Sequence, residues 1–257
     1  MTVNYHTHTV RCRHATGTER EYIETAIARG IKLLGFSDHS PYVFEGSYYS
    51  GFRMRPEELE GYYKTLDSLR EEYKGEIEIK IGLEAEYYPR FFDKYLKLIE
   101  PYGIDFLILG QHFMANEIEG IYSAQPTSDP ERIRTYATQI VEGMKSGKFT
   151  YVAHPDVLPF RGEPEAYRRE MSRICEAAKE LDIPLEINML GLRDNRNYPN
   201  PEFWKLVAEH GCRVVAGCDA HSPDAVAEPV NVRKTYEFAK RLGIKIEDKP
   251  LALRKPT

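Results

Sequence analysis

The chain has 257 residues, of which 42% are hydrophobic, so it is long enough to bury one large core. Its 35 basic and 40 acidic residues give a net charge of -5, which argues against a protein dominated by nonspecific nucleic-acid binding. With no amino-terminal signal pattern, no run of about 20 apolar residues and no C-x-x-C pair, the sequence predicts a cytoplasmic protein without membrane segments or a disulfide framework.

Short apolar runs alternate with amphipathic stretches of helical length along the chain. We expect strands at residues 3–5, 32–36, 77–83, 106–109, 150–153, 185–187 and 214–216. We expect helices at residues 18–29, 56–73, 89–102, 129–146, 165–181, 201–210 and 231–242. Seven strand and helix units in this order predict a parallel sheet, and no Pro-, Gly- or Ser-rich linker divides them. The sequence therefore favours a single α/β domain over residues 1–257.

Most of the histidines follow the predicted strands. His6 and His8 are two residues apart, so on an extended backbone both rings project from the same side. Asp219 and His221 repeat this spacing after the last strand. A lone H-x-H pair is as often incidental as it is a metal site, but the two motifs strengthen each other, because the carboxyl ends of strands in a closed barrel converge on one face.

Acidic residues follow the third predicted strand. A carboxylate can bridge two cations, which imidazole cannot do, and a cluster of neutral histidines needs acidic ligands to offset several positive charges. We therefore expect Glu84 to bind metal, and we interpret Glu86 as a salt-bridged or solvated carboxylate. His210, at a predicted helix end, suits the helix dipole and is interpreted as structural. The long aromatic loop 41–55 is expected to cover the site.

Seven motifs follow one another over nearly the whole chain: His6-Thr7-His8, His14, Ser37-Asp38-His39-Ser40, Gly82-Leu83-Glu84-Ala85, Gln111-His112, His154-Pro155-Asp156 and Asp219-Ala220-His221. In this order they resemble the motifs of the PHP (polymerase and histidinol phosphatase) family. Arg53-Met54-Arg55 and the segment from Asn188 to Arg193 most resemble the stand-alone histidinol-phosphate phosphatases. The resemblance implies a distorted (β/α)7 barrel with three metal ions, in agreement with the seven units counted above.

Carried over by position, the resemblance also implies the metal ligands. The first ion would bind His6, His8, Glu84 and Asp219, the second Glu84, His112 and His154, and the third His14, His39 and His221. All of these positions are filled, which indicates a working enzyme. Nitrogen and oxygen ligands suit zinc, manganese or iron. One departure is Gln111, where many relatives have a small residue before the histidine, and this affects only the local pocket.

The activity implied by the resemblance is hydrolysis of a small phosphomonoester, L-histidinol phosphate, in histidine biosynthesis. We expect a hydroxide that bridges the first two ions to attack phosphorus, while the third ion binds a phosphate oxygen. Asp219 is a candidate to relay a proton, and Arg161 and Arg193 are candidates to bind phosphate, because guanidinium matches its geometry. Asp38 is expected to orient a histidine. Two further residues, Asp156 and Asn188, are expected to line the pocket.

Other functions remain open. A related PHP phosphoesterase would act on another small phosphate ester, a nucleotide or a nucleic-acid end, although the acidic charge and the absence of a basic appended domain weigh against nucleic acid. An amidohydrolase-like barrel also opens with H-x-H, but such enzymes usually have lysine where Glu84 stands and bind at most two metals. A noncatalytic binding module is least favoured, because the ligand set is complete.

Overall fold

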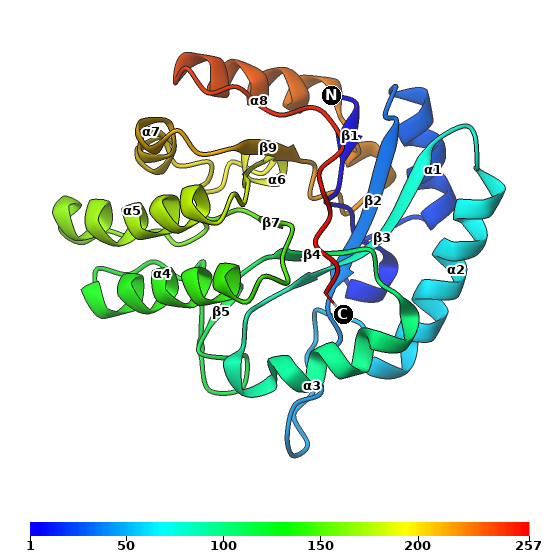
Figure 1. Cartoon of the computed structure of the whole chain (residues 1–257), viewed down its shortest axis with the longest axis horizontal. Helices are drawn as coiled ribbons and strands as arrows, with labels where there is room; N and C mark the ends of the chain where they lie inside the picture. Colours follow the sequence, from blue (N-terminus) through cyan, green and yellow to red (C-terminus); the bar gives the residue numbers. More distant parts are fainter. Residues whose placement is uncertain (257) are drawn as a thin grey trace.

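A computed structural model of the chain describes residues 1–256 and contains a sheet of seven parallel strands. The strands lie in the order β1 (Val3–Asn4), β2 (Leu33–His39), β3 (Glu78–Ala85), β4 (Phe106–Leu109), β7 (Tyr151–Val152), β8 (Leu185–Asn188) and β9 (Val214–Gly217). Every pairing between neighbours is parallel. The predicted strands are therefore confirmed in number and order, and the sheet curls into a distorted, nearly closed (β/α)7 barrel (Figure 1).

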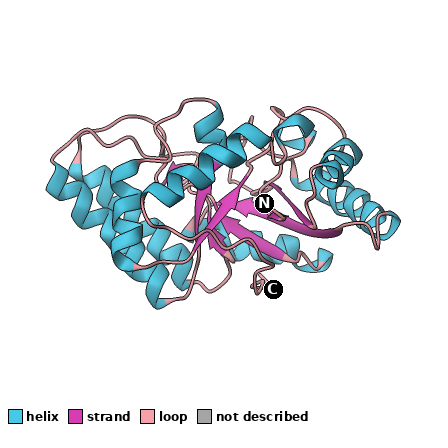
Figure 2. Cartoon of the chain, turned by 90° about the horizontal axis from the view of Figure 1, so that it is seen from above, coloured by secondary structure: helices cyan, strands magenta, loops and turns pink. Residues whose placement is uncertain are grey.

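Helices surround the sheet (Figure 2). They are α1 (Glu19–Ala28), α2 (Leu59–Glu72), α3 (Pro89–Ile99), α4 (Pro130–Lys145), α5 (Pro164–Glu180), α7 (Pro201–His210) and α8 (Pro229–Arg241), which confirms the predicted helices with small shifts at their ends. Thr18 begins α1 with a capping box to Glu21, and proline occupies the first turn of most of the others. Within residues 1–256, no helix is both long and apolar enough to span a membrane.

Several short elements were not predicted. They are a hairpin of β5 (Phe113–Met114) and β6 (Ile121–Tyr122), the five-residue helix α6 (Met189–Arg193), and 3-10 turns at Val10–Cys12 and Pro223–Ala225. Two further 3-10 turns, Pro56–Glu58 and Glu100–Tyr102, lie inside the predicted helices 56–73 and 89–102, before α2 and after α3. Elements this short contain too few residues to show a hydrophobic period. The hairpin and α6 both lie beyond the carboxyl ends of strands, where they build the walls of the site.

The barrel closes between its first and last strands through short contacts near the site. Thr7 and Ala220 form an isolated parallel bridge, and the amide of His8 donates to the carbonyl of Ala220 at 2.9 Å. The buried side chain of Asn4 accepts a hydrogen bond from the amide of Cys218 at 2.9 Å. These contacts bring the H-x-H motif of β1 beside the D-x-H motif of β9.

The carboxyl-terminal segment closes the opposite end of the barrel. Ile246 pairs with Val214 of β9, and the carboxylate of Asp248 accepts hydrogen bonds from the amides of Thr2 at 2.7 Å and Val3 at 3.1 Å. The last residues then cross the sheet (Figure 1). Apolar side chains of this segment pack on the barrel interior, which is filled by Val3, Tyr5, Leu33, Phe106, Ile108, Tyr151, Ala153 and Val215. Packing thus closes the amino-terminal end of the barrel, and the carboxyl ends of the strands remain accessible for a functional site.

Candidate metal centre

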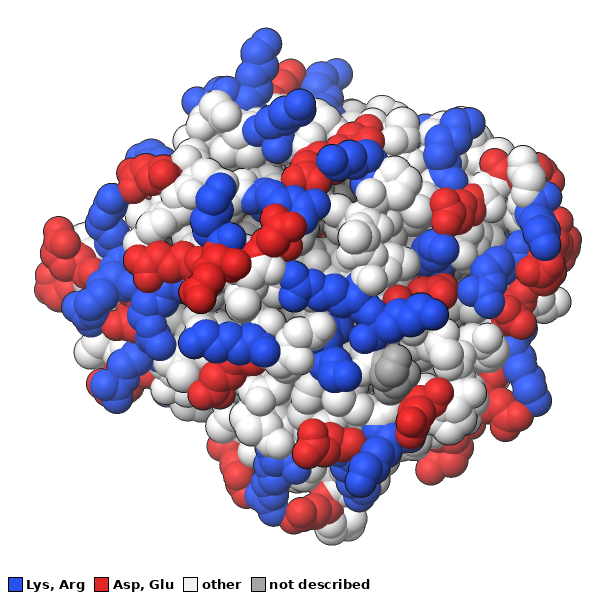
Figure 3. Space-filling model, in the orientation of Figure 1, with Lys and Arg blue, Asp and Glu red and all other residues white. Residues whose placement is uncertain are grey.

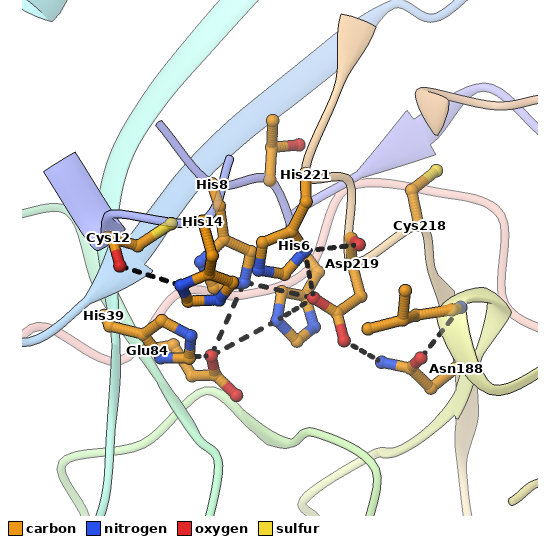
Figure 4. A network of polar contacts seen from close by, with 12 residues as sticks. His6, His8, Cys12, His14, His39, Glu84, Asn188, Cys218, Asp219 and His221 are labelled. Carbon is orange, nitrogen blue, oxygen red and sulfur yellow. Dashed lines mark hydrogen bonds and ion pairs between the residues drawn. The ribbon is translucent and has the colours of Figure 1, made fainter. Parts of the chain in front are cut away.

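The histidine and acidic motifs converge at the carboxyl ends of the strands, around the carboxylate of Glu84. Figure 4 shows the rings and carboxylates pointing toward one another from separate strands and loops. The oxygens of Glu84 lie between 2.8 and 3.6 Å from ring nitrogens of His6, His8, His39, His112 and His154. On the other side of the cluster, Oδ1 of Asp219 lies 3.1 Å from Nε2 of His8 and 3.4 Å from Nδ1 of His221.

Groups of these side chains have the spacing needed to hold cations. Ligand atoms lie within 4.8 Å of one another in five sets, namely His6 with His8 and Asp219, His6 with Glu84 and His154, His8 with His39 and Glu84, His14 with His39 and His221, and His8 with Cys12 and His221. The first set holds three of the four residues expected for one site, and the fourth set holds all three residues expected for another. His112 belongs to none of these sets, but its Nε2 lies 3.5 Å from Glu84.

Unpartnered buried atoms test whether this donor set fits metal ions. Within residues 1–256, no hydrogen-bond partner is present for His6 Nε2, His8 Nε2, His39 Nδ1, Glu84 Oε2, His154 Nδ1 or His221 Nε2, although all are buried. Buried polar atoms without partners are rare because each costs free energy. Their concentration around one carboxylate, as nitrogen and oxygen donors, is the pattern that divalent cations require.

Two of the expected ligands have unusual backbone conformations. His154 has φ of 30° and Asp219 has φ of 45°, both in the left-handed region that side chains rarely adopt. Such strain persists only where the surrounding structure enforces it, and it is concentrated at functional sites. Each of these residues lies two positions after the end of its strand, β7 or β9, and its side chain points into the cluster.

A second layer of carboxylates lies behind three of the rings. Nδ1 of His6 is 2.9 Å from Glu186, Nδ1 of His8 is 3.4 Å from Asp38, and Nδ1 of His112 is 3.0 Å from Glu86. Carboxylate partners of this kind fix the tautomer and the orientation of a metal-binding ring. The expectation for Asp38 is confirmed. The role of Glu186 was missed, although a charged residue inside the apolar strand β8 was a signal for it.

The buried charges perturb one another strongly. Burial raises the pKa of the Glu84 carboxyl, but the surrounding histidines outweigh it and hold that pKa well below its usual range. Burial lowers the pKa of His8, yet Asp219 and Asp38 raise it to about 9. Burial and the charge of His8 together lower the pKa of His221 to about 2. The metal-free cluster therefore retains protons on some rings, and an incoming cation has to displace them.

A cavity of about 530 Å³ opens onto the histidine cluster. Phe52, from the loop 41–55, lines it, so part of this loop covers the site as expected. Arg193 also lines the cavity, whereas Arg161 is exposed and lies outside its lining. Arg196, which sequence reasoning missed, is on the wall beside Arg193. Its position three residues after Arg193, just beyond the end of α6, was the available signal.

Three other pocket expectations need correction. Asp156 accepts hydrogen bonds from the amide of Asn200 and the indole of Trp204, so it anchors α7 and does not line the cavity. Asn188 is buried and is not among the residues that line the cavity. Its side chain accepts hydrogen bonds from the first amides of α6 and donates one to Asp219 at 3.0 Å. The side chain of Gln111 bonds to the backbone of Tyr87 and Phe113, so the unusual residue before His112 braces neighbouring segments and does not alter the pocket.

Comparison with known proteins agrees with this architecture. A protein from Deinococcus radiodurans named "Probable histidinol-phosphatase" is 29% identical over 238 residues, which cover 86% of each chain. A "Probable phosphatase" of Shewanella frigidimarina is 26% identical, covering 95% of this chain and 86% of its own. The structure of histidinol phosphate phosphatase (HisK) from Lactococcus lactis, complexed with zinc, L-histidinol and phosphate, superposes with a TM-score of 0.72 at 22% identity, covering 95% of each chain.

The family model for the PHP domain matches residues 4–189, and this range includes β1 to β8 and most of the clustered histidines. Asp219 and His221 lie beyond the match, but β9 returns them to the same cluster beside His8. The matched range is well over half of the chain. The chain therefore belongs to the PHP family.

Proposed function

We propose that this chain is a metal-dependent phosphomonoesterase that hydrolyses L-histidinol phosphate to L-histidinol and phosphate, and that its whole length forms one catalytic barrel domain. The observation that carries the proposal is the set of unpartnered buried nitrogen and oxygen atoms around Glu84. The substrate is suggested by the names of the Deinococcus and Lactococcus relatives.

Three divalent ions, zinc, manganese or iron, would occupy the cluster in this proposal. Glu84 would be shared between a site with His6, His8 and Asp219 and a site with His112 and His154, and the third site would use His14, His39 and His221. Such ions supply Lewis acidity and neutralise phosphoryl oxygens, which matters because uncatalysed phosphomonoester hydrolysis is extremely slow.

Two arginines of the chain would bind the phosphoryl group on the cavity side. Arg193 and Arg196 flank Asp194, whose two oxygens each accept from one guanidinium at 3.2 Å. This shared carboxylate orients both side chains and leaves other N–H groups for an anion. Both arginines line the cavity that contains the histidines, so a phosphate between them would lie against the cluster. Arg161 is retained as a candidate from the family resemblance, although its side chain is exposed.

Proton transfer is assigned to Asp219. Its Oδ1 faces His8, while its Oδ2 accepts a hydrogen bond from Nδ2 of Asn188 at 3.0 Å. Asn188 is itself fixed, because its Oδ1 caps α6 and its Nδ2 also donates to Glu186. The carboxylate is therefore held at the inner wall of the cavity, where it would accept a proton from the attacking water or pass one to the leaving alkoxide.

Steady-state kinetics on a panel of phosphomonoesters tests the proposal. We expect the highest kcat/KM for L-histidinol phosphate, and much lower values for nucleoside monophosphates and for 3′-phosphorylated oligonucleotides. Highest activity on a nucleotide or a nucleic-acid end would assign the chain to another branch of PHP phosphoesterases. A nucleic-acid substrate is not favoured by the net charge of -5. On the face opposite the site, which Figure 3 shows, basic and acidic side chains are interspersed.

A matched pair of histidine variants tests the site. His112→Ala is expected to abolish phosphate release and to reduce the bound metal, while His210→Ala, at the carboxyl end of α7, leaves both unchanged. Elemental analysis should find three ions per chain. A count of two or fewer in the fully active protein would contradict the trinuclear site, and full activity after metal removal would refute metal-dependent hydrolysis.

A further inference from the structure

Arg53 is the most deeply buried cation near the site, with only 2% of its side chain exposed. All five of its N–H groups are paired. Nε donates to Glu117, Nη1 donates to the carbonyl of Ser40 and to Oε2 of Glu86, and Nη2 donates to Oε1 of Glu86 and to Glu117, at distances from 2.7 to 3.1 Å. A lysine offers three donors without the planar fork and could not reproduce this set.

The partners of Arg53 come from three different segments. Ser40 follows β2 and stands next to His39, while Glu86 follows β3 two residues after Glu84. Glu117 lies in the turn between β5 and β6, and its other oxygen accepts from the hydroxyl of Tyr48 at 2.8 Å. Arg53 itself belongs to the loop 41–55, so its guanidinium joins this loop and the hairpin to the ends of β2 and β3.

The ion pair with Glu86 leads directly to the metal cluster. Oε1 of Glu86 is shared, because it accepts from Nη2 of Arg53 at 2.9 Å and lies 3.0 Å from Nδ1 of His112. A carboxylate only accepts hydrogen bonds, so Nδ1 of His112 carries a proton, and in the neutral ring Nε2 is left with its lone pair. This Nε2 is the atom that lies 3.5 Å from Glu84. The bidentate contact of Arg53 fixes the plane of the Glu86 carboxylate and with it the direction of the His112 ring.

The residue before Arg53 packs on the same part of the cluster. The ring of Phe52 meets the rings of His39 and His112 edge to face, with centroids 5.2 and 6.0 Å apart, and the guanidinium carbon of Arg53 lies 4.4 Å from the Phe52 centroid. Stability alone does not account for such an arrangement, because buried ion pairs contribute little net stability compared with well-packed apolar residues.

We propose that Arg53 is a positioning residue for the metal centre: it holds Glu86 so that His112 presents Nε2 toward Glu84, and it thereby sets the affinity for the ion bound by His112. The role in ion binding rests on the proposed function of the cluster, whereas the orientation of His112 is a property of the metal-free chain.

Two conservative variants and a matched control test this role. Arg53→Lys keeps the positive charge but loses the planar guanidinium that makes the bidentate contact with Glu86. Glu86→Gln removes the carboxylate that Arg53 and His112 share. Arg55→Lys is the control, because Arg55 belongs to the same loop and is exposed, its guanidinium contacts Tyr49, and its backbone amide donates to Glu58. The first readout is the nitrogen NMR spectrum of His112 in the metal-free protein at alkaline pH, where the two tautomers of the neutral ring give different nitrogen shifts. The second is the affinity and number of zinc ions bound at equilibrium.

We expect the Nδ1–H tautomer of His112 in the parent chain and in Arg55→Lys, and a mixture of tautomers in Arg53→Lys and Glu86→Gln. One zinc ion should bind about 10- to 100-fold more weakly in both of the latter variants, while the remaining ions bind as before. Since both changes act through one carboxylate, the double variant should bind zinc no more weakly than Glu86→Gln alone.

An unchanged tautomer and unchanged zinc affinity in folded Arg53→Lys would overturn the proposal. If Arg53→Lys does not fold, Glu86→Gln and Glu117→Gln decide it, because Glu117 does not touch His112. The proposal would be supported if Glu86→Gln binds one zinc ion more weakly and Glu117→Gln loses less zinc affinity. Full zinc affinity in Glu86→Gln would refute the proposal. A chain that binds zinc as described but releases no phosphate would refute the proposed function and leave this positioning role standing.

Discussion

Gly110→Ala tests whether the position of the Glu84 carboxylate controls activity. A Cβ added at residue 110 would lie 1.9 Å from Oε1 of Glu84 and 2.6 Å from its Cδ. Restoring an ordinary contact of 3.4 Å requires the oxygen to move by about 1.5 Å. The backbone of Gly110 does not have the positive φ that disfavours other residues, so alanine can adopt its conformation. The substitution therefore acts on Glu84 and leaves the backbone unstrained.

The expected loss follows from this displacement. A shift of about 1 Å in a catalytic group costs about 100-fold in rate, or about 2.7 kcal/mol of transition-state stabilisation. We expect kcat/KM for L-histidinol phosphate to fall by at least this factor, together with a loss of bound metal. Gly61→Ala is the control, because no atom lies within 4 Å of its added Cβ in α2, and it should stabilise the helix by about 1 kcal/mol without a change in activity. If Gly110→Ala keeps parent activity and metal content, the central role of Glu84 is wrong.

Three further predictions concern the metal ions, the phosphate and the carboxyl-terminal segment. Although burial disfavours the charged ring, neighbouring carboxylates raise the pKa of His8 to about 9, so below that pH a bound ion displaces a proton. Metal affinity should therefore rise from pH 7 to 9, and calorimetry in buffers of different ionisation enthalpy should detect the released proton, whereas pH-independent affinity would contradict the assignment. Arg193→Ala and Arg196→Ala should each raise KM for the phosphate ester about 10-fold or more, with a smaller effect of Arg161→Ala, and equal effects at all three positions would place the phosphate elsewhere. Asp248→Ala should lower the free energy of unfolding by about 1–3 kcal/mol in urea titrations at neutral pH. Burial opposes ionisation of Asp248, but backbone amides depress its pKa, so its contribution is present above the unfolded-state pKa of about 4 and is lost as pH falls through the lower folded value. Equal stability of variant and parent at neutral pH would show that the hydrogen bonds from the amides of Thr2 and Val3 to Asp248 do not stabilise the fold.

The barrel and most of its ligands could be predicted because the signal is local. Each strand is a short apolar run, and a histidine or carboxylate directly after such a run has no packing reason to be there. Parallel strands then bring these residues to one end, which makes His8 and His221 neighbours despite their separation in sequence, with ring centroids 4.0 Å apart.

The residues that orient the ligands could not be predicted in the same way. Glu86 was predicted to be salt-bridged or solvated; the structure shows it buried and salt-bridged, with its partner Arg53 33 residues away in a loop without regular structure. Glu186 stands inside a strand, where alternation alone does not say whether it faces the core or His6. Arg196 depends on the short helix α6, whose five residues show no period. Such contacts are set by tertiary packing, and the single sequence contains no local pattern for them.

The second layer also explains how so many charges can share one buried site. Carboxylates behind His6, His8 and His112 offset cationic charge without occupying positions next to the ions, and they make the rings more basic. The rings of His14 and His221 instead face the backbone carbonyls of Cys12 and Asp219, at 2.7 and 3.1 Å. Nδ1 of His221 also lies 3.4 Å from the carboxylate of Asp219, so His14 is the ring with only a neutral partner, and a carbonyl offsets less charge than a carboxylate. Both rings line the cavity. In the proposed function, an ion bound by His14 would keep more of its positive charge. We therefore expect this side of the cluster to attract the phosphate most strongly, and the side backed by carboxylates to hold its ions most tightly.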